Sequence, residues 1–436
     1  MYAYSKRGSL NGSLAVPGSK SSTIRAVLFG MLADGTTVIH NPLPSKDGLA
    51  ALKAARDFGA EVVVDDAANT WTVTGLNGKP RVPENVLDTM NSGTTTSFVT
   101  GICTLLTDGW AVITGDGQIR RRPWRHETNA LTELGAKCIH TRPGCDCPPL
   151  VIQGPLHGGV CHLPGFNSQH ISGILAPAAL LPEGESVDIE VENPLEALYV
   201  QLTVDWLKRF GVTVGNTPDY RHYHVDGGQK LTGCDCLVAS DWSGVAFPLV
   251  AAVCTPSELT ITDVEFNDAQ GDKAVVDILI RMGADIEKDI AGHRLTVHGG
   301  KPLHGLSEID MNLIPDSLPA LSVAAAYAEG DTHFTSLAHV RVKETDRVAV
   351  MQEMLSACGA DVDITADSMT VHGGKPLHGA SVSSHDDHRV AMAMTVCGLF
   401  ADGEMRIDNA ECAAVSFPGF YETLNKAGAG FELKEN

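Results

Sequence analysis

The sequence predicts an α/β protein of two lobes, each made of three repeats that contain two helices and several strands. Three observations support this prediction. A glycine junction recurs six times, an apolar helix recurs at the same period, and the length of 436 residues exceeds what one core usually supports. Six units in a chain of this length indicate two lobes of three.

The glycine junction has the form apolar, Gly, small or apolar. Its glycines are Gly59, Gly135, Gly211, Gly283, Gly359 and Gly428, at steps of 76, 76, 72, 76 and 69 residues. The string TVHGGKPLHG also occurs twice, from Thr296 and from Thr370, 74 residues apart. Each of the first five junctions follows a helical pattern and precedes a strand-like one. Glycine at that place fits a helix C-terminus with a positive φ.

The second recurring element is an apolar helix, mostly followed by a short turn and a strand. These helices are apolar nearly all round, so we expect them to be buried, with the other helix of each repeat on the outside. An open solenoid is the alternative. The long, unequal strands and the lack of capping repeats disfavour it.

Polar residues gather at the starts of the six apolar helices. The starts are Lys20-Ser21-Ser22, Asn91-Ser92-Gly93-Thr94, Asn167-Ser168-Gln169, Asp241-Trp242-Ser243, Pro315-Asp316-Ser317 and Asp387-His388-Arg389. N-capping explains the Ser, Thr, Asp and Asn residues, but it does not explain Lys20, Gln169 or Arg389. The helix dipole disfavours a cation there unless an anion binds in front of it. The pattern, with the charged runs 120–122 and 341–347, predicts an anion-binding site.

Composition excludes several classes of function. The net charge of −21 disfavours nucleic-acid binding. No stretch reaches the roughly 18 apolar residues of a membrane helix, and the N-terminus lacks an apolar signal region, so we expect a cytoplasmic protein. Two Cys-Asp-Cys runs, at Cys145 and Cys147 and at Cys234 and Cys236, could hold a metal, but their spacing favours free thiols. We expect no metal and no cofactor.

Eight segments resemble the motifs of the 5-enolpyruvylshikimate-3-phosphate (EPSP) synthase family, in the same order along the chain. They are PGSKSSTIRA, NSGTTTSF, GDGQIRRRP, NSQ, DMNLIPDSLPAL, VKETDR, DDHRVAMA and SFPGFYE. The resemblance implies an inside-out α/β fold, with three βαβαββ-type repeats per lobe around buried parallel helices. It also implies that the chain crosses between lobes twice, which gives a first lobe of residues 20–239 and a second lobe of 1–19 plus 240–436.

The same resemblance implies a function. A member of this family transfers the enolpyruvyl group of phosphoenolpyruvate to the 5-hydroxyl of shikimate 3-phosphate and releases phosphate, in aromatic amino-acid biosynthesis. We therefore expect small-molecule substrates, a monomer, and neither nucleic acid nor membrane as a partner.

Residue roles follow from the motif positions. The group expected to bind phosphoenolpyruvate is Lys20, Gly93, Arg122, Gln169, Arg347 and Arg389, with the two last on its carboxylate. The group expected to contact the acceptor is Ser21, Arg25, Asn167, Ser168, Gln169, Tyr199, Asp316, His339 and Lys343. Lys20, Asp316 and Glu344 are the expected catalytic residues, and the two carboxyls are the candidates for general acid and base.

Four positions depart from the family pattern. Val415 stands where the family has a Lys that contacts phosphoenolpyruvate, and His339 stands where it usually has Asn. Asn167 and Glu196 stand where two serines usually hold the acceptor's phosphate, beside the retained Ser168. Local variation within an ordinary family member would explain this. A paralogue that uses another alcohol, or an inactive ligand-binding homologue, are the alternatives.

Overall fold

The computed structural model describes residues 1–435 and divides into two compact units. The first lobe comprises Gly18–Val238, and the second comprises Met1–Pro17 together with the chain from Ala239 onward. Each lobe contains three four-stranded sheets.

The sheets of the first lobe share one strand order. They are β14 (Asp235–Leu237)-β3 (Thr36–His40)-β5 (Thr70–Thr74)-β4 (Glu61–Asp65), β6 (Leu87–Asp88)-β7 (Ala111–Thr114)-β9 (Leu150–Gln153)-β8 (Lys137–His140), and β10 (Gly159–Leu163)-β11 (Ser186–Val191)-β13 (His222–Asp226)-β12 (Gly215–Asn216). In each sheet the first two strands are parallel and the remaining pairs are antiparallel.

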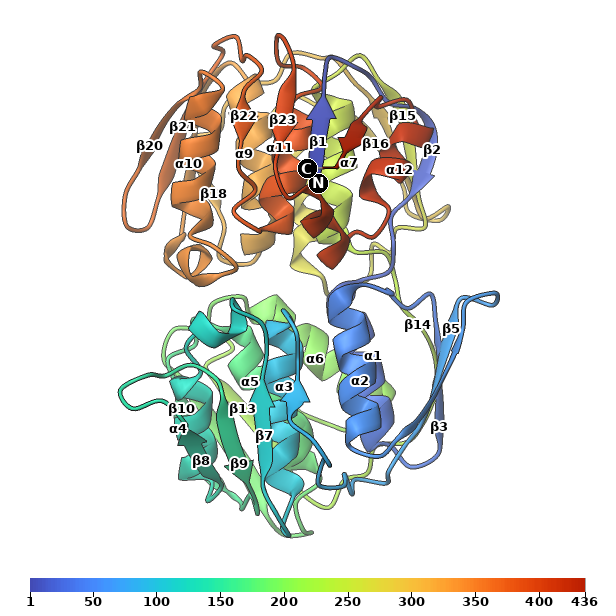
Figure 1. The fold of residues 1–436 in the computed structure, drawn as a ribbon, viewed down its shortest axis with the longest axis vertical. Coiled ribbons are helices and arrows are strands. Elements are labelled where there is room, and N and C mark those ends of the chain that lie inside the picture. The colour runs from blue at the N-terminus through green and yellow to red at the C-terminus, as the bar shows by residue number, and fades with distance from the viewer. Residues whose placement is uncertain (436) are drawn as a thin grey trace. The chain divides into compact units, whose positions relative to one another are not determined.

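The sheets of the second lobe follow the same plan, with two sheets completed by the N-terminal strands. They are β2 (Asn11–Ala15)-β15 (Glu258–Thr262)-β17 (Arg294–His298)-β16 (Asp285–Asp289), β18 (Ile309–Asp310)-β19 (Gly330–Thr335)-β21 (Met369–Gly373)-β20 (Asp361–Ile364), and β22 (Ser381–Val382)-β23 (Met405–Ile407)-β1 (Tyr2–Ser5)-β24 (Glu432–Lys434). Ala3 of β1 is paired with Ile407 on one side and Leu433 on the other. Figure 1 shows the blue β1 beside the red β23.

Two helices belong to each repeat, one inside and one outside. The inner helices are α1 (Lys20–Leu32), α3 (Gly93–Ile102), α5 (Ser168–Ala179), α7 (Trp242–Val253), α9 (Leu318–Tyr327) and α11 (His388–Cys397). The outer helices are α2 (Lys46–Asp57), α4 (Arg125–Glu133), α6 (Ala197–Arg209), α8 (Ala274–Arg281), α10 (Arg347–Ala357) and α12 (Phe420–Lys426). Read in order, the second repeat runs β6-α3-β7-α4-β8-β9, which confirms the βαβαββ unit.

The inner helices form the core of each lobe. Every residue of α3, α7 and α11 is buried, and each inner helix lies against its own sheet (Figure 1). Burial on all sides removes the helix ends from water, so side chains must satisfy their backbone groups. Ser19, Ser92, Asn167, Asp241 and Asp387 do so at five of the six starts.

The six glycine junctions end the six outer helices, which confirms the prediction for the first five and extends it to the sixth. All six glycines have positive φ, between 87° and 107°. At the first junction Gly59 N–H donates to Arg56 O at 2.8 Å, and Ala60 N–H donates to Ala55 O at 3.0 Å. This pair of bonds is the Schellman turn, and it recurs at the other five. A side chain at the glycine would be strained by the left-handed backbone.

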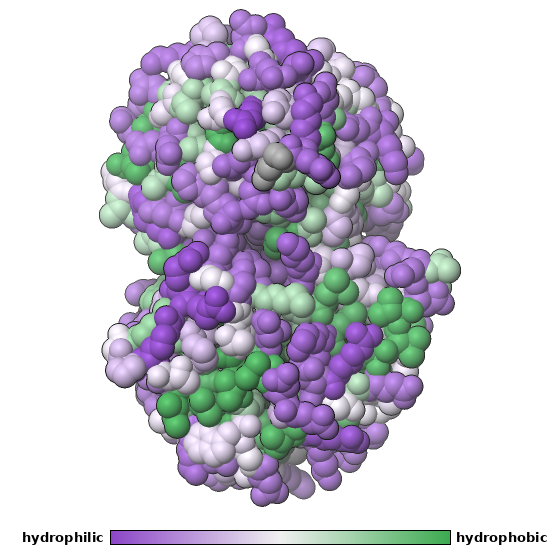
Figure 2. Space-filling model, in the orientation of Figure 1, coloured by the Kyte–Doolittle hydropathy of each residue, from purple (hydrophilic) through white to green (hydrophobic). Residues whose placement is uncertain are grey.

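The surface agrees with the acidic composition. On the face drawn in Figure 2, hydrophilic residues cover most of the area, and apolar residues form smaller patches. Val63 and Ile139, on the outer strands β4 and β8, are among the exposed apolar side chains. None of the helices between residues 1 and 435 has the length and apolar character that a membrane span requires.

One acidic side chain is buried inside the first lobe. Glu127 of α4 is fully inaccessible and lies where α3 and α5 approach most closely: a Cβ added to Gly173 would be 2.6 Å from its Oε1. Burial raises the pKa of Glu127 well above its usual range, and the nearby Ser97 and Trp124 side chains only partly oppose this. Neither carboxyl oxygen has a well-aligned hydrogen-bond partner within the described chain. Burial therefore favours the protonated form of Glu127 in the folded state.

We expect Glu127→Gln to stabilise the protein increasingly as pH rises. In the wild type, a raised folded-state pKa means that stability falls as pH rises from the unfolded-state value toward the folded-state value, by up to about 1.4 kcal/mol per pH unit. The amide has no proton to lose, so the difference in free energy of unfolding between variant and wild type should grow with pH. Urea unfolding at several pH values measures it.

Glu61→Gln provides the control. It is the same substitution, glutamate to glutamine, at an exposed position in a strand. Its effect on stability should be small, as for most substitutions at exposed positions. A difference between E127Q and wild type that is constant with pH would contradict a protonated Glu127.

Candidate active site

The start of α1 carries an ion pair in the first lobe. Lys20 is the first residue of the helix, and its Nζ lies 3.2 Å from Asp47 Oδ2 on α2. Both side chains are mostly buried, with 13% and 5% of their surface exposed. Asp47 was not identified from the sequence. It lies in the first turn of an outer helix, where an acidic residue is common for reasons of capping alone, so no local signal distinguished it.

The structure brings Gly93, Arg122 and Gln169 together. Gly93 is the first residue of α3, and a Cβ built on it would lie 2.9 Å from Arg122 Nη1 and 3.0 Å from Gln169 Oε1. Gln169 belongs to α5, and its Nε2 donates to Thr94 Oγ1 of α3 at 3.3 Å, which links these two helices. A cationic guanidinium, an amide and the N-terminus of α3 therefore meet in one place, which favours binding of an anion.

Arg122 reaches this place from a short helical turn. Residues Ile119–Arg121 form the 3-10 turn η2, and Arg122 follows it in an extended conformation, before Pro123. Asp116 supports the turn, since its Oδ1 accepts from the backbone of Gln118 at 2.8 Å. Arg120 points elsewhere and donates to Gly115 O at 2.7 Å. Of the three consecutive arginines, the structure thus places Arg122 beside Gly93.

At the start of α5, side chains of the protein accept hydrogen bonds from the first residues of the helix. Asn167 Oδ1 accepts from the backbone N–H of Gln169 at 3.0 Å. Glu196 Oε2 accepts from the Ser168 hydroxyl at 2.8 Å and, more weakly, from the Ser168 backbone N–H at 3.4 Å. Glu196 is 1% exposed and directly precedes α6. The two departures from the family pattern, Asn167 and Glu196, therefore act on the same helix start.

Arg25, Ser21 and Tyr199 form a third group in the first lobe. The Arg25 guanidinium is buried and donates to Ser21 O at 2.8 Å, to Tyr199 O at 3.0 Å and to Thr203 Oγ1 at 2.9 Å. It also lies 5.3 Å from the centre of the Phe98 ring. All these contacts are with residues of the first lobe. In this structure Arg25 therefore connects α1 to α6.

The second lobe contains a buried network of charges around Arg347. Arg347 is the first residue of α10 and is 1% exposed. Its guanidinium donates to Asp316 Oδ1 at 2.8 Å, to Glu344 Oε2 at 2.6 Å and to Asp387 Oδ2 at 2.8 Å. Arg389, on α11, donates to the other Asp316 oxygen at 2.8 Å. Asp316 therefore joins the two arginines that were predicted to form a pair.

This network fixes the charge of Asp316, which lies in the 3-10 turn η4 (Pro315–Ser317) before α9. Burial alone would raise the pKa of Asp316, but Arg389, Arg347 and Lys343 outweigh it and hold the pKa below its usual range. The carboxylate is ionised at any working pH.

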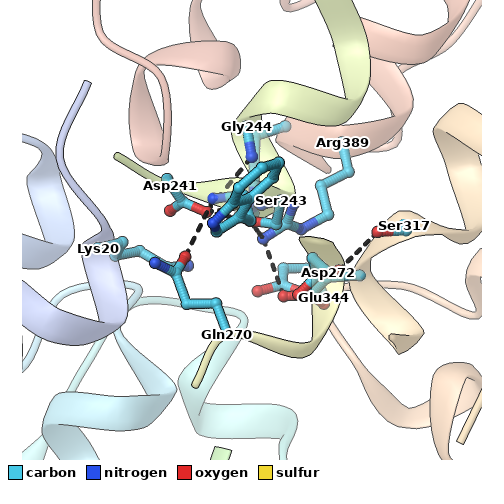
Figure 3. A network of polar contacts seen from close by, with 12 residues as sticks. Lys20, Asp241, Ser243, Gly244, Gln270, Asp272, Ser317, Glu344 and Arg389 are labelled. Atoms are coloured by element: carbon cyan, nitrogen blue, oxygen red, sulfur yellow. Dashed lines mark hydrogen bonds and ion pairs between the residues drawn. The ribbon is translucent and has the colours of Figure 1, made fainter. Parts of the chain in front are cut away.

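Asp387 and Ser243 belong to this network and were not assigned a role from the sequence. Asp387 caps α11 by accepting from Arg389 N–H at 2.9 Å and also binds Arg347. Ser243, near the start of α7, accepts from Arg389 Nη2 at 3.0 Å. Figure 3 shows Arg389, Ser243 and Asp241 close together. Their place at polar helix starts was the available signal, but it could not be separated from ordinary capping.

Two further predicted residues, His339 and Lys343, and the departure Val415 lie in or next to short turns of the second lobe. His339 is 3% exposed in η5 (Ala338–Val342), and Lys343 follows this turn. Lys343 is near enough to Asp316 to lower its pKa. Val415 ends the 3-10 turn η6 (Ala410–Val415) and is 7% exposed, so the position where the family has a lysine is apolar and nearly buried.

The cysteines are free thiols. All eleven cysteines of the sequence lie in the described part of the chain and none is in a disulfide, including Cys145, Cys147, Cys234 and Cys236. Residues 1–435 contain no group of three or more His, Cys, Asp or Glu side chains placed to hold a metal ion.

Comparisons with known proteins find the same family over nearly the whole chain. Residues 4–424 match the family described as EPSP synthase (3-phosphoshikimate 1-carboxyvinyltransferase). A protein of that second name from Ruminiclostridium cellulolyticum is 40% identical over 434 residues, which is 99% of this chain and 100% of the relative. The one from Methanocaldococcus jannaschii is 35% identical and covers 98% of each chain.

Solved structures agree. EPSP synthase from Acinetobacter baumannii superposes with a TM-score of 0.84 and 32% identity, covering 100% of both chains. The enolpyruvyl transferase NikO from Streptomyces tendae has a TM-score of 0.79 at 19% identity, covering 99% of this chain and 98% of its own. The second likeness shows a shared fold alone. The family match and the curated relatives show that this chain belongs to the EPSP synthase family.

Proposed function

We propose that the protein transfers the enolpyruvyl group of phosphoenolpyruvate to the 5-hydroxyl of shikimate 3-phosphate and releases phosphate. The observation that carries this proposal is the full-length identity of 40% to a 3-phosphoshikimate 1-carboxyvinyltransferase. The grouping of Gly93, Arg122 and Gln169 at one helix start supports it, because a phosphate is the kind of ligand that such a start binds. A monomeric state and a cytoplasmic location stay predictions.

Two groups of residues are assigned to the donor. We assign its phosphate to Lys20, Gly93, Arg122 and Gln169 and its carboxylate to Arg347 and Arg389. A guanidinium presents paired N–H donors that match a carboxylate. In Arg347 these donors already contact three protein carboxylates.

The reaction proceeds by addition and elimination. The acceptor oxygen forms a bond to C2 of the donor while a proton is added to C3, which gives a tetrahedral ketal. The C2–O bond to phosphate then breaks and the C3 proton is removed, which restores the double bond. One group must take the hydroxyl proton, and another must give and later recover the C3 proton. Lys20 and Arg122 stabilise the charge that develops on phosphate.

The ionised state of Asp316 separates the two roles. A carboxylate whose pKa is held low is a poor proton donor, but it is a good hydrogen-bond acceptor. We therefore assign to Asp316 the orientation of the acceptor hydroxyl. Asp316 accepts the hydroxyl proton as the oxygen bonds to C2, because that proton is then acidic enough for a weakly basic carboxylate to take it. Glu344, the second carboxyl on Arg347, is left as the acid and base at C3.

Phosphate release from phosphoenolpyruvate is the direct test. We expect release in the presence of shikimate 3-phosphate, with a product heavier than the acceptor by the enolpyruvyl group in mass spectrometry. Without acceptor we expect no release above the uncatalysed background. Equal release with and without acceptor would make the protein a phosphatase, and no release with shikimate 3-phosphate would contradict the proposed acceptor.

Gly93→Ala tests the donor-phosphate group. The added methyl group would crowd Arg122 Nη1 and Gln169 Oε1, and loss of one good contact raises KM about tenfold. We expect that increase for phosphoenolpyruvate, with a much smaller change in KM for the acceptor. Steady-state kinetics with each substrate varied in turn measures both.

Gly215→Ala is the matched control, because its Cβ would have no neighbour closer than 3.7 Å. It should leave both constants unchanged. If Gly93→Ala raised KM for the acceptor as much as for the donor, the assignment of this group to the donor phosphate would be wrong.

Asp316→Asn tests the assignment of the base. The amide keeps the shape but cannot accept the hydroxyl proton, so kcat should fall by about 10²–10⁴-fold, the range of general acid–base catalysis. Because Asp316 is ionised throughout, we expect the acid limb of the wild-type pH profile to report another group. Asp310→Asn, on the exposed end of β18, should keep full activity. A kcat for D316N within threefold of wild type would exclude the role.

A further inference from the structure

Two cysteines of the first lobe lie in the loop that joins β8 to β9. The loop begins with a tight turn, in which Cys145 N–H donates to Arg142 O at 3.1 Å. Pro143 and Gly144 form the centre of this turn, and Gly144 has φ 70°, as a type II turn requires. The turn leads directly into Cys145 and Cys147, which are both half-buried free thiols.

The two thiols contact each other. The sulfur of Cys145 is hydrogen-bonded by the backbone N–H and by the thiol of Cys147. These bonds, together with the charge of Arg142, lower the pKa of Cys145, whereas burial and the same thiol contact raise the pKa of Cys147. The more nucleophilic thiolate is therefore that of Cys145, and Cys147 keeps its proton.

This arrangement is that of an oxidisable pair. A thiolate attacks a peroxide to give a sulfenic acid, and a second thiol close by condenses with the sulfenic acid to give a disulfide. In an extended chain, Cα atoms two residues apart are separated by about 7 Å, whereas a disulfide joins Cα atoms about 5 to 6 Å apart. A bond between Cys145 and Cys147 therefore requires the backbone to bend at Asp146.

Asp146 is attached to the segment that carries Arg122. Its backbone oxygen accepts from Trp124 N–H at 2.7 Å. From the start of the same loop, Arg142 donates to Arg120 O at 2.6 Å. The loop therefore contacts the chain just before and just after Arg122.

A disulfide would change these contacts. Its two sulfur atoms are about 2 Å apart, much closer than in a hydrogen bond, so the chain at Asp146 must move. The Asp146 carboxylate is also paired with Arg125, so a movement of Asp146 is passed to both Trp124 and Arg125. Arg122 directly precedes this part of the chain, and its Nη1 lies 2.9 Å from the position of a Cβ on Gly93.

The same tripeptide occurs a second time in a different setting. The thiols of Cys234 and Cys236 are also in contact, but Asp235 and Cys236 belong to strand β14. Cys236 is paired with Ile39 of β3, is 6% exposed, and donates its thiol to Val38 O at 3.6 Å. The sheet keeps this backbone extended and shields Cys236. We therefore expect this second pair to stay reduced.

We propose that Cys145 and Cys147 form a peroxide-sensitive site, whose oxidation to a disulfide weakens the binding of phosphoenolpyruvate at Arg122. This inference rests on the proposed function, in which Arg122 contacts the donor phosphate. The oxidant is a peroxide, and hydrogen peroxide is the probe.

The chemistry takes two steps. The Cys145 sulfur forms a bond to one peroxide oxygen, the O–O bond breaks, and the other oxygen leaves as water after it takes up a proton. The Cys147 sulfur then displaces the oxygen of the sulfenic acid, which leaves as a second water. Overall the two thiols lose two protons and two electrons, and hydrogen peroxide becomes two molecules of water.

Peptide mapping tests this chemistry. The reduced full-length protein is treated with hydrogen peroxide, its remaining thiols are alkylated, and the digest is analysed by mass spectrometry. We expect the peptide with Cys145 and Cys147 to lose two hydrogen atoms and to resist alkylation, while Cys234 and Cys236 are alkylated. In Cys147→Ser, Cys145 should accumulate as a sulfenic acid that a cyclic diketone traps. Cys145→Ser should give neither product in this loop.

Calorimetric titration with phosphoenolpyruvate measures the effect on the site. We expect the Kd of oxidised wild type to be about tenfold higher than that of reduced protein, and to return to the reduced value after dithiothreitol. Cys145→Ser should keep the reduced wild-type Kd before and after peroxide, which excludes damage elsewhere in the chain. Cys234→Ser is the matched control, because it removes a thiol of the second pair, and it should respond to peroxide as wild type does.

The outcomes separate this inference from the proposed function, because neither measurement requires turnover. If both expected results are obtained but shikimate 3-phosphate gives no phosphate release, the redox site stands and the proposed acceptor is wrong. Absence of the disulfide between Cys145 and Cys147, or a disulfide that leaves the Kd unchanged, would overturn the inference. Reduced protein that does not bind phosphoenolpyruvate would overturn both.

Discussion

Near-complete burial of six helices is the constraint on which both the fold and the site depend. A helix without contact to water cannot leave its first N–H groups unpaired, so the inner helices begin at Ser, Asn or Asp caps almost throughout. The same requirement keeps polar side chains at the starts of otherwise apolar helices. An anion site needs these same features, N–H donors at a helix N-terminus in a place that excludes water. Every repeat of the fold therefore provides a buried helix N-terminus with polar side chains, which are the features that an anion site needs.

Electrostatics in the second lobe shows how an acidic protein keeps cations in such places. A guanidinium as buried as Arg347 is stable only when it is paired and hydrogen-bonded. Asp316, Glu344 and Asp387 each form an ion pair with Arg347. The three carboxyls are therefore coupled electrostatically through this one guanidinium. The pairing has a chemical consequence, because a carboxylate held between two arginines stays ionised. The structural requirement of burying Arg347 and the chemical requirement of an ionised Asp316 are thus met by one set of contacts.

The repeats and the buried helices could be predicted from the sequence, because both produce residue patterns that recur at a regular spacing. The six glycines mark the ends of the outer helices, and the apolar helices mark the core, since both effects are local. Contacts between distant elements left no such mark. Asp47 beside Lys20, Asp387 on Arg347 and the carboxyl of Glu127 between α3 and α5 are all acidic residues near helix starts, where capping is the usual reason for them. Only the folded chain shows which of these residues also bind a partner across the core.

The repeat plan also tolerates different residues at the starts of the inner helices. An inner helix needs a cap and an apolar body, and this leaves the residues beside the cap open to change. The six starts of this chain already differ, with Lys20, Gly93 and Gln169 in one lobe and Ser243, Asp316 and Arg389 in the other. NikO keeps the same architecture at 19% identity, so the architecture tolerates wide substitution. Glu196 is a change of this kind: it lies outside α5, and its carboxylate accepts from the backbone N–H and the hydroxyl of Ser168 at the start of that helix.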